Sequence, residues 1–179
     1  MPKYTIARRG LVSAAVAILA VLIGACGGAP GTASGGGEQQ QAPGELEGLT
    51  AEQVVAQVAQ RVPEAEPSVV FTAATDPNDL LGRPNGYVSK ASFTDTRIDQ
   101  ATLEGLEPGA VDFGGTVEVF EDEDAATKRM EYIQAVLGSD TPFGTEYDYV
   151  RGPVLLRVIG TLTPDQAAAY EAALDAIES

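Results

Sequence analysis

The chain has 179 residues, with 26 acidic and 11 basic side chains and a net charge of −15. This acidity argues against nucleic acids and other phosphate-rich partners, because like charges repel. The chain has no histidine and a single cysteine, so it lacks Ser-His and Cys-His nucleophile pairs, internal disulfides and the commonest transition-metal ligand.

Residues 1–25 have the composition of an export signal. Lys3, Arg8 and Arg9 precede an uncharged apolar run, residues 11–25. At 1.5 Å per residue this run covers roughly 22 Å, which is shorter than a hydrocarbon core of roughly 30 Å. We therefore expect residues 1–25 to be a signal peptide.

The apolar run ends in Ile23-Gly24-Ala25-Cys26. This segment resembles the lipobox of bacterial lipoproteins, although Leu is commoner at the position of Ile23, and Ala, Ser or Thr at that of Gly24. The resemblance implies that the thiol of Cys26 receives a diacylglyceryl group and that Cys26 becomes the mature N-terminus. It also implies a lipid anchor on the extracytoplasmic face of the cell membrane. The alternatives are an ordinary secretory signal with a chance cysteine and an uncleaved membrane anchor.

Residues 26–48 are rich in Gly, Ser, Pro and Gln and poor in large apolar side chains. Such a segment buries too little surface to offset its ordering entropy, so we expect a flexible linker after the lipidated cysteine. Removal of residues 1–25 would take away three basic residues, which leaves 8 − 26 = −18. That charge favours a basic partner or a cation, or it serves only solubility.

Residues 49–179 have the pattern of one globular α+β domain. Capping boxes at residues 50–53 and 163–166 predict the starts of two helices, of which the first ends at Pro63. Four acids at residues 121–124 predict the start of a third helix, which ends near Gly138.

Five segments have strand-like composition or alternation: residues 68–73, 86–93, 116–120, 146–150 and 154–161. The last two flank a predicted hairpin turn at residues 151–153, and residues 95–113 are predicted to be a long excursion. The order α-β-β-β-α-β-β-α predicts a mainly antiparallel sheet of about five strands, with three helices packed on one face.

Residues 76–79 (DPND) begin like a calcium-binding EF-hand loop, but Leu80 and Leu81 occupy the positions of a ligand and of the required glycine. We expect Asp76 and Asn78 to make turn hydrogen bonds instead. We therefore predict no metal and no cofactor for this chain.

Ser89 and Lys90 are the residue types of a Ser-Lys dyad, but neighbours on a strand point to opposite faces. No catalytic residue is predicted, and we do not expect an enzyme. A basic spot at Arg83 and Lys90, with Tyr87 between them, is a candidate partner-binding site. The alternative is a tight turn at residues 85–86, with basic groups that balance nearby acids.

Together these features predict a lipid-anchored extracytoplasmic binding or interaction module, accessory or inhibitory to an envelope protein. The alternatives are an envelope-acting enzyme that uses carboxylates and a small-ligand-binding lipoprotein. The Ala- and Gly-rich composition with acidic helices resembles small actinobacterial lipoproteins whose functions are unassigned. The sequence leaves the ligand, the partner and the oligomeric state open.

Overall fold

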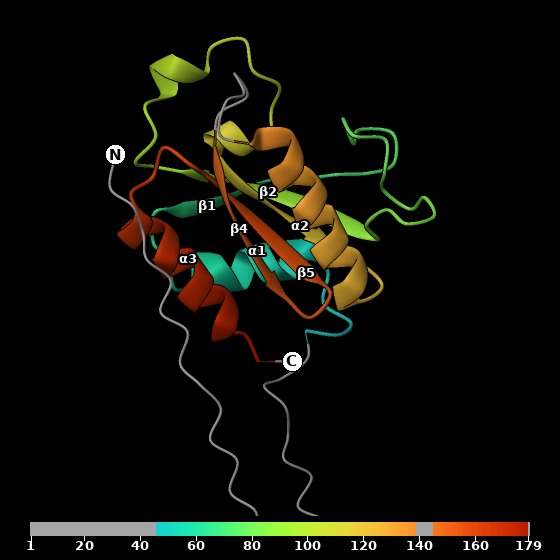
Figure 1. Cartoon of the computed structure of the whole chain (residues 1–179). Helices are drawn as coiled ribbons and strands as arrows, with labels where there is room; N and C mark the ends of the chain where they lie inside the picture. Colours follow the sequence, from blue (N-terminus) through green and yellow to red (C-terminus); the bar gives the residue numbers. More distant parts are fainter. Residues whose placement is uncertain (1–45, 139–144, 179) are drawn as a thin grey trace, which may run out of the picture. The chain divides into compact units, whose positions relative to one another are not determined.

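Five strands form one antiparallel sheet, in the order β1-β2-β3-β5-β4 (Figure 1). The computed structural model describes residues 46–138 and 145–178, which belong to one compact unit. The strands are β1 (Ala65–Val70), β2 (Ser89–Asp95), β3 (Gly114–Val119), β4 (Glu146–Arg151) and β5 (Val154–Ile159). The predicted α+β class and the predicted order of elements are confirmed. The predicted signal peptide, the Cys26 site and most of the linker lie outside the described residues.

Three α-helices begin where the capping signals predict. They are α1 (Ala51–Ala59), α2 (Glu123–Leu137) and α3 (Pro164–Asp175). Thr50 and Thr163 each complete a capping box, and the side chain of Asp122 accepts a hydrogen bond from the first turn of α2. Each cap satisfies backbone N–H groups that a helix leaves unpaired at its start. Among the described residues, no helix combines the length and hydropathy that a membrane span requires.

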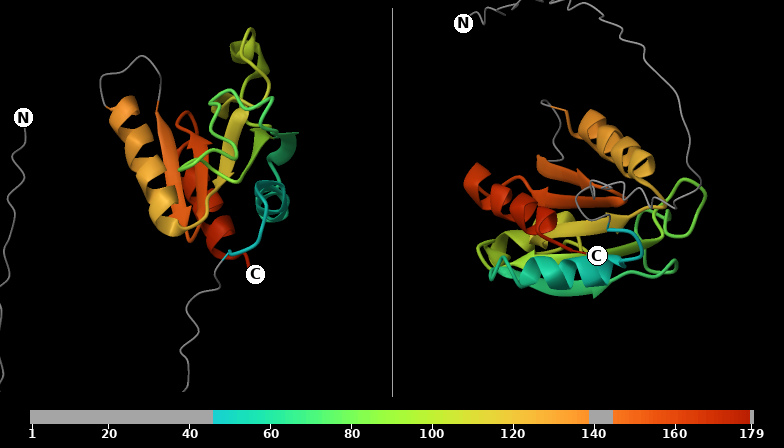
Figure 2. Two further views of the ribbon diagram at one scale, coloured as in Figure 1. Left: turned by 90° about the vertical axis from the view of Figure 1, so that its right-hand side faces the viewer. Right: turned by 90° about the horizontal axis from the view of Figure 1, so that it is seen from below.

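The helices cover both faces of the sheet, which corrects the expectation of one covered face. Helices α1 and α3 lie on one side and α2 on the other (Figure 2). Alternation along the strands explains the difference, because both faces of β5 are apolar: Leu156 faces α1 and α3, whereas Leu155 faces α2. The sheet therefore has two cores.

The core under α1 and α3 is the larger and more apolar one. It is built mainly from Val, Leu and Ile, together with two aromatic rings. The ring of Phe93 stacks on that of Tyr170 at 5.1 Å between centroids, and the Tyr170 hydroxyl donates to buried Asp95 at 2.6 Å. This face attaches α1 and α3 to the sheet by apolar packing.

The core under α2 is smaller. Its fully or nearly buried members are Tyr87, Phe120, Ala126, Ile133 and Leu155, and the rings of Tyr87 and Phe120 meet edge to face at 5.9 Å. The same face of the sheet also carries the buried charged side chains of Lys90 and Glu118, from which the site is built.

The first two strands differ from their predicted bounds. β1 begins and ends three residues earlier, and β2 begins at Ser89, so the residues from 71 to 88 form a loop that we call the β1–β2 loop. Gly86 N–H donates to the carbonyl of Arg83 at 2.9 Å and Asn85 has a positive φ, so a tight turn spans residues 83–86 and includes the predicted residues 85–86. The long excursion before β3 is also confirmed and contains two short 3₁₀ turns, Gln100–Leu103 and Val111–Phe113.

Candidate functional site

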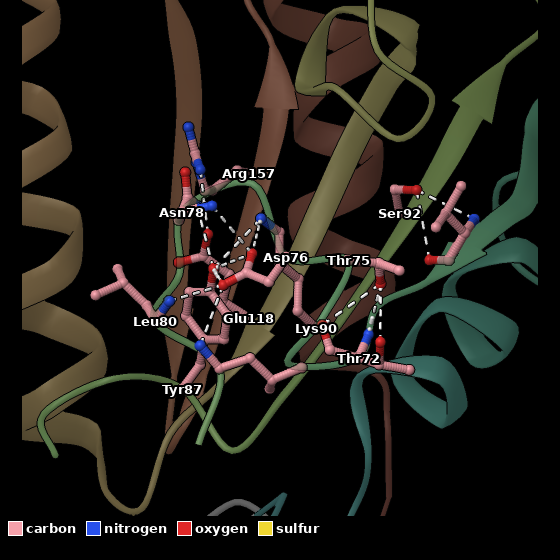
Figure 3. A network of polar contacts seen from close by, with 12 residues as sticks. Thr72, Thr75, Asp76, Asn78, Leu80, Tyr87, Lys90, Ser92, Glu118 and Arg157 are labelled. Carbon is pink, nitrogen blue, oxygen red and sulfur yellow. Dashed lines mark hydrogen bonds and ion pairs between the residues drawn. The ribbon is translucent and has the colours of Figure 1, made fainter. Parts of the chain in front are cut away.

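Asp76 fixes the β1–β2 loop to the sheet (Figure 3). Its carboxylate accepts hydrogen bonds from the Tyr87 hydroxyl at 2.6 Å and from Lys90 Nζ at 3.1 Å. It also accepts from the backbone N–H groups of Leu80 and Leu81, at 2.8 and 3.1 Å. The predicted turn hydrogen bonds of Asp76 are thus confirmed, and the same carboxylate also reaches across the fold to Lys90 on β2.

Lys90 and Asp76 form a buried ion pair. The Lys90 side chain is 3% exposed, and its Nζ lies 4.6 Å from the centroid of the Phe71 ring. Burial lowers the pKa of Lys90, against the attraction of Glu118 and Asp76. Burial also opposes the charge of Asp76, but the hydrogen bonds from Tyr87, the loop backbone and Lys90 outweigh it and hold the pKa of Asp76 well below its ordinary value.

A second ionic network attaches α2 to the same face of the sheet. Glu118 of β3 is fully buried and accepts hydrogen bonds from Arg129 Nε of α2 at 3.1 Å and from Arg157 Nη1 of β5 at 3.2 Å. Arg157 also donates two hydrogen bonds to Glu146 of β4, at 2.8 and 2.9 Å. This ionic network thus links four secondary-structure elements: β3, α2, β5 and β4.

Asp148 of β4 lies beside this network without a full set of partners. Its Oδ1 is buried and has no hydrogen-bond partner among the described residues. Burial raises the pKa of Asp148 to about 6, and the neighbouring Glu146 carboxylate adds to the shift, while Arg157 opposes it. At neutral pH the Asp148 carboxylate is therefore held in an unfavourable environment, which the ionised form tolerates less well than water.

The β1–β2 loop and α2 enclose a groove of about 1180 Å³. Three of the most exposed large apolar side chains line it: Val88 at 52%, Tyr132 at 62% and Val136 at 44%. Arg129 and Arg157 also line the groove, but their side chains are only 14% and 12% exposed, so they lie deeper in it. The groove has apolar walls and a cationic interior.

The charges of the groove differ in sign from those of the whole chain. Four basic and three acidic side chains line it, so its sum is 4 − 3 = +1, on a chain of net charge −15. The basic residues are Arg83, Lys128, Arg129 and Arg157. Three acids that pair with these cations, Asp79, Glu118 and Glu146, do not line the groove. The lining is therefore less acidic than the chain as a whole, and the charges beside it are largely balanced.

The structure separates the three predicted partner-binding residues. Arg83 is exposed at the groove and forms an ion pair with Asp79. Tyr87, in the β1–β2 loop, and Lys90, on β2, are both buried, so a partner on the surface does not reach their side chains. Their role in this structure is to hold the loop, while partner binding by Arg83 stays a prediction.

The sequence analysis missed Glu118, Arg129 and Arg157. A signal was present in the strands, because Glu118 and Arg157 each occupy the alternate position between apolar residues. Nothing in the local sequence distinguished Arg129 from the other charges of α2. Only the fold brings its guanidinium to Glu118.

Two further expectations concern catalytic and metal sites. Ser89 Oγ accepts a hydrogen bond from the backbone N–H of Ala51 on the α1 side of the sheet, whereas Lys90 lies on the α2 side. The two side chains of the considered dyad thus point to opposite faces, as predicted. In the part of the chain that the structure describes, no three Asp, Glu, Cys or His side chains gather as a metal site would require.

Comparisons of the chain with models of protein families, with curated protein sequences and with solved structures gave no match.

Proposed function

We propose that this chain is a lipid-anchored binding module on the extracytoplasmic face of the cell membrane, accessory or inhibitory to an envelope protein. The groove between α2 and the β1–β2 loop is the contact site in this proposal. The anchor rests on the lipobox resemblance at Cys26, and the linker provides reach from the membrane.

The observation that carries the proposal is the composition of the groove. Val88, Tyr132 and Val136 expose large apolar surfaces to solvent at one place, although burial would be more favourable. Arg129 and Arg157 are held rigid beneath them by buried Glu118. Apolar walls above fixed polar groups give a binding site both affinity and orientation.

The shape and the carboxylates favour an interaction module over the two alternatives. Asp76 and Glu118 are buried and paired with cations, and Asp148, whose pKa is raised, does not line the groove, so none of these three presents a free acid or base there. A site for a small molecule buries most of its ligand, whereas this groove is open to solvent. An open groove suits a segment of a larger partner.

Site-specific photo-cross-linking in the native membrane tests this proposal. A photoreactive phenylalanine analogue replaces Tyr132 in the groove, and the matched control replaces Val70, which is 54% exposed on β1 outside the groove. We expect one dominant protein adduct from position 132 that is absent from position 70, with the partner identified by mass spectrometry. Equal adducts from both positions, or none from position 132, would contradict the proposed role of the groove.

A further inference from the structure

We propose that the segment bound in the groove is an extended peptide with a carboxylate side chain between apolar residues, and that Arg129 binds this carboxylate. The inference deepens the proposed function and rests on the groove being the contact site. It specifies the chemistry that a partner segment must present.

Arg129 is oriented by the fold and retains donors for a ligand. Its Nε donates to buried Glu118 at 3.1 Å, and its guanidinium carbon lies 5.7 Å from the centroid of the Tyr132 ring. With the amide oxygen of Asn78 turned toward it, Nη2 donates to that oxygen at 3.3 Å. Nη1 has no hydrogen-bond partner within residues 46–138 and 145–178. A planar guanidinium held in this way matches a carboxylate better than a mobile ammonium group does.

The other cations of the groove are either exposed to water, at 58% for Arg83 and 70% for Lys128, or shared between two acids, as for Arg157. Arg83 pairs with Asp79, and Lys128 pairs with Asp124. Arg157 divides its donors between Glu118 and Glu146. Arg129 is therefore the cation of the groove that combines low exposure with a guanidinium nitrogen, Nη1, that has no hydrogen-bond partner among the described residues.

The acids of the groove are partly engaged as well. Asp122 caps α2, and Asp124 holds Lys128, so Glu121 is the acid of the lining for which the described residues show no side-chain partner. Glu121 is exposed, whereas the Arg129 side chain is 14% exposed. A charge interaction with Arg129 is therefore less screened by water than one with Glu121. The groove accordingly favours an anionic ligand group over a cationic one.

The net negative charge of the chain opposes an acidic ligand only at long range. At physiological ionic strength, interactions between exposed charges are largely screened beyond about 8 Å. Inside the groove the nearest hydrogen-bond donors determine which ligand group binds, and Arg129 Nη1 is such a donor without a partner among the described residues. An acidic segment with few charges therefore binds locally despite the charge of the whole domain.

The dimensions of the groove suit an extended peptide. Its α2 wall runs from Asp124 to Leu137, which is roughly 20 Å at 1.5 Å per residue. An extended strand rises about 3.3 Å per residue, so about six residues of a partner lie along this wall. Apolar side chains on either side of the carboxylate would then cover Tyr132 and Val136, the exposed apolar residues of α2.

An unbiased peptide selection tests the inference. The purified full chain, held in lipid nanodiscs, selects from a displayed library of random peptides of about ten residues, long enough for the wall, and empty nanodiscs remove background binders. We expect enriched peptides to carry Asp or Glu next to apolar residues. Replacement of that acid by its amide should weaken binding about tenfold, the loss expected for one charge-assisted contact.

Two substitutions on α2 complete the test. Arg129→Gln should abolish the preference for the acid over its amide. Lys128→Gln removes the same formal charge from the next, more exposed residue of the groove and should preserve that preference. If Arg129→Gln fails to fold, the comparison of acid and amide peptides on the unmodified chain still tests whether the groove prefers a carboxylate.

Several results would overturn the inference. They are the absence of enriched peptides, enriched peptides without acids, basic enriched peptides, and an acid preference that survives Arg129→Gln in a folded variant. None of these results depends on the photo-cross-linking at Tyr132. If cross-linking at Tyr132 captures a partner but the selected peptides show no preference for acids, the proposed function stands. Only the inference that Arg129 binds a carboxylate would then be refuted.

Discussion

Replacement of Asp148 by Asn should stabilise this protein at neutral pH. Asp148 is partly buried, has one carboxylate oxygen without a hydrogen-bond partner among the described residues, and lies beside the carboxylate of Glu146. An ionised carboxylate in such a place is less stable than in water. Asn retains the shape of the side chain and removes the charge.

The magnitude follows from the displacement of the Asp148 pKa. The shift from 3.8 to about 6 corresponds to about 3 kcal/mol at about 1.4 kcal/mol per unit. Because part of the side chain is exposed, solvent screening reduces this to about 1–2 kcal/mol. The unfolded chain releases this proton near pH 4 and the folded chain near pH 6. The contribution of Asp148 to the unfolding free energy is therefore fully present below pH 4, where the carboxyl is protonated, and is lost as the pH rises through 6.

Urea denaturation of residues 27–179 between pH 4 and pH 7.5 measures this effect. The difference in unfolding free energy between Asp148→Asn and the unmodified chain should be small at pH 4. It should grow to about 1–2 kcal/mol in favour of the variant above pH 6.5. Asp112→Asn, which removes an exposed acid, is the control and should give no such rise. A difference that is flat with pH, or a variant less stable at pH 7, would refute the reasoning.

Three further predictions concern the β1–β2 loop and the anchor. Lys90→Met should lower the unfolding free energy by about 3 kcal/mol, because Asp76 stays buried without its cation; in urea denaturation, a loss no larger than that of exposed Arg83→Met would contradict this. Gly86→Ala should lower Tm by several degrees in calorimetry, since its Cβ would lie 1.9 Å from a backbone oxygen; an unchanged Tm would show that the loop yields at little cost. Cys26→Ala should move the protein out of the membrane fraction, and unchanged membrane association and processing would reject lipidation.

Local signals explain why the starts of the helices were predicted well, whereas α1 ends at Ala59, before the predicted stop at Pro63. A capping box needs only four consecutive residues, and the hydrogen bonds at Thr50 and at Thr163 form within those residues. The acids before α2 act in the same local way through the Asp122 cap. Such signals do not depend on how the chain folds elsewhere.

The start of β2 was mispredicted because a distant contact overrides a local preference. The segment before Ser89 has the β-rich composition of a strand, with aromatic Tyr87 and β-branched Val88. In the fold, however, the Tyr87 hydroxyl donates to Asp76, eleven residues earlier, and this keeps Tyr87 in the loop. The ion pair of Arg129 and Glu118 was not predicted for the same reason, because the two side chains come together only when α2 packs on the sheet.

Among the charged side chains under α2, some affect both stability and binding, whereas Asp148 is expected to affect stability alone. Glu118 both fastens α2 to the sheet and orients the Arg129 guanidinium toward the groove, so its loss would affect folding and binding together. Asp148 belongs to the same polar layer but does not line the groove. Because a more stable domain tolerates more substitutions, Asp148→Asn provides the background on which the roles of Arg129 and Glu118 in binding are best resolved.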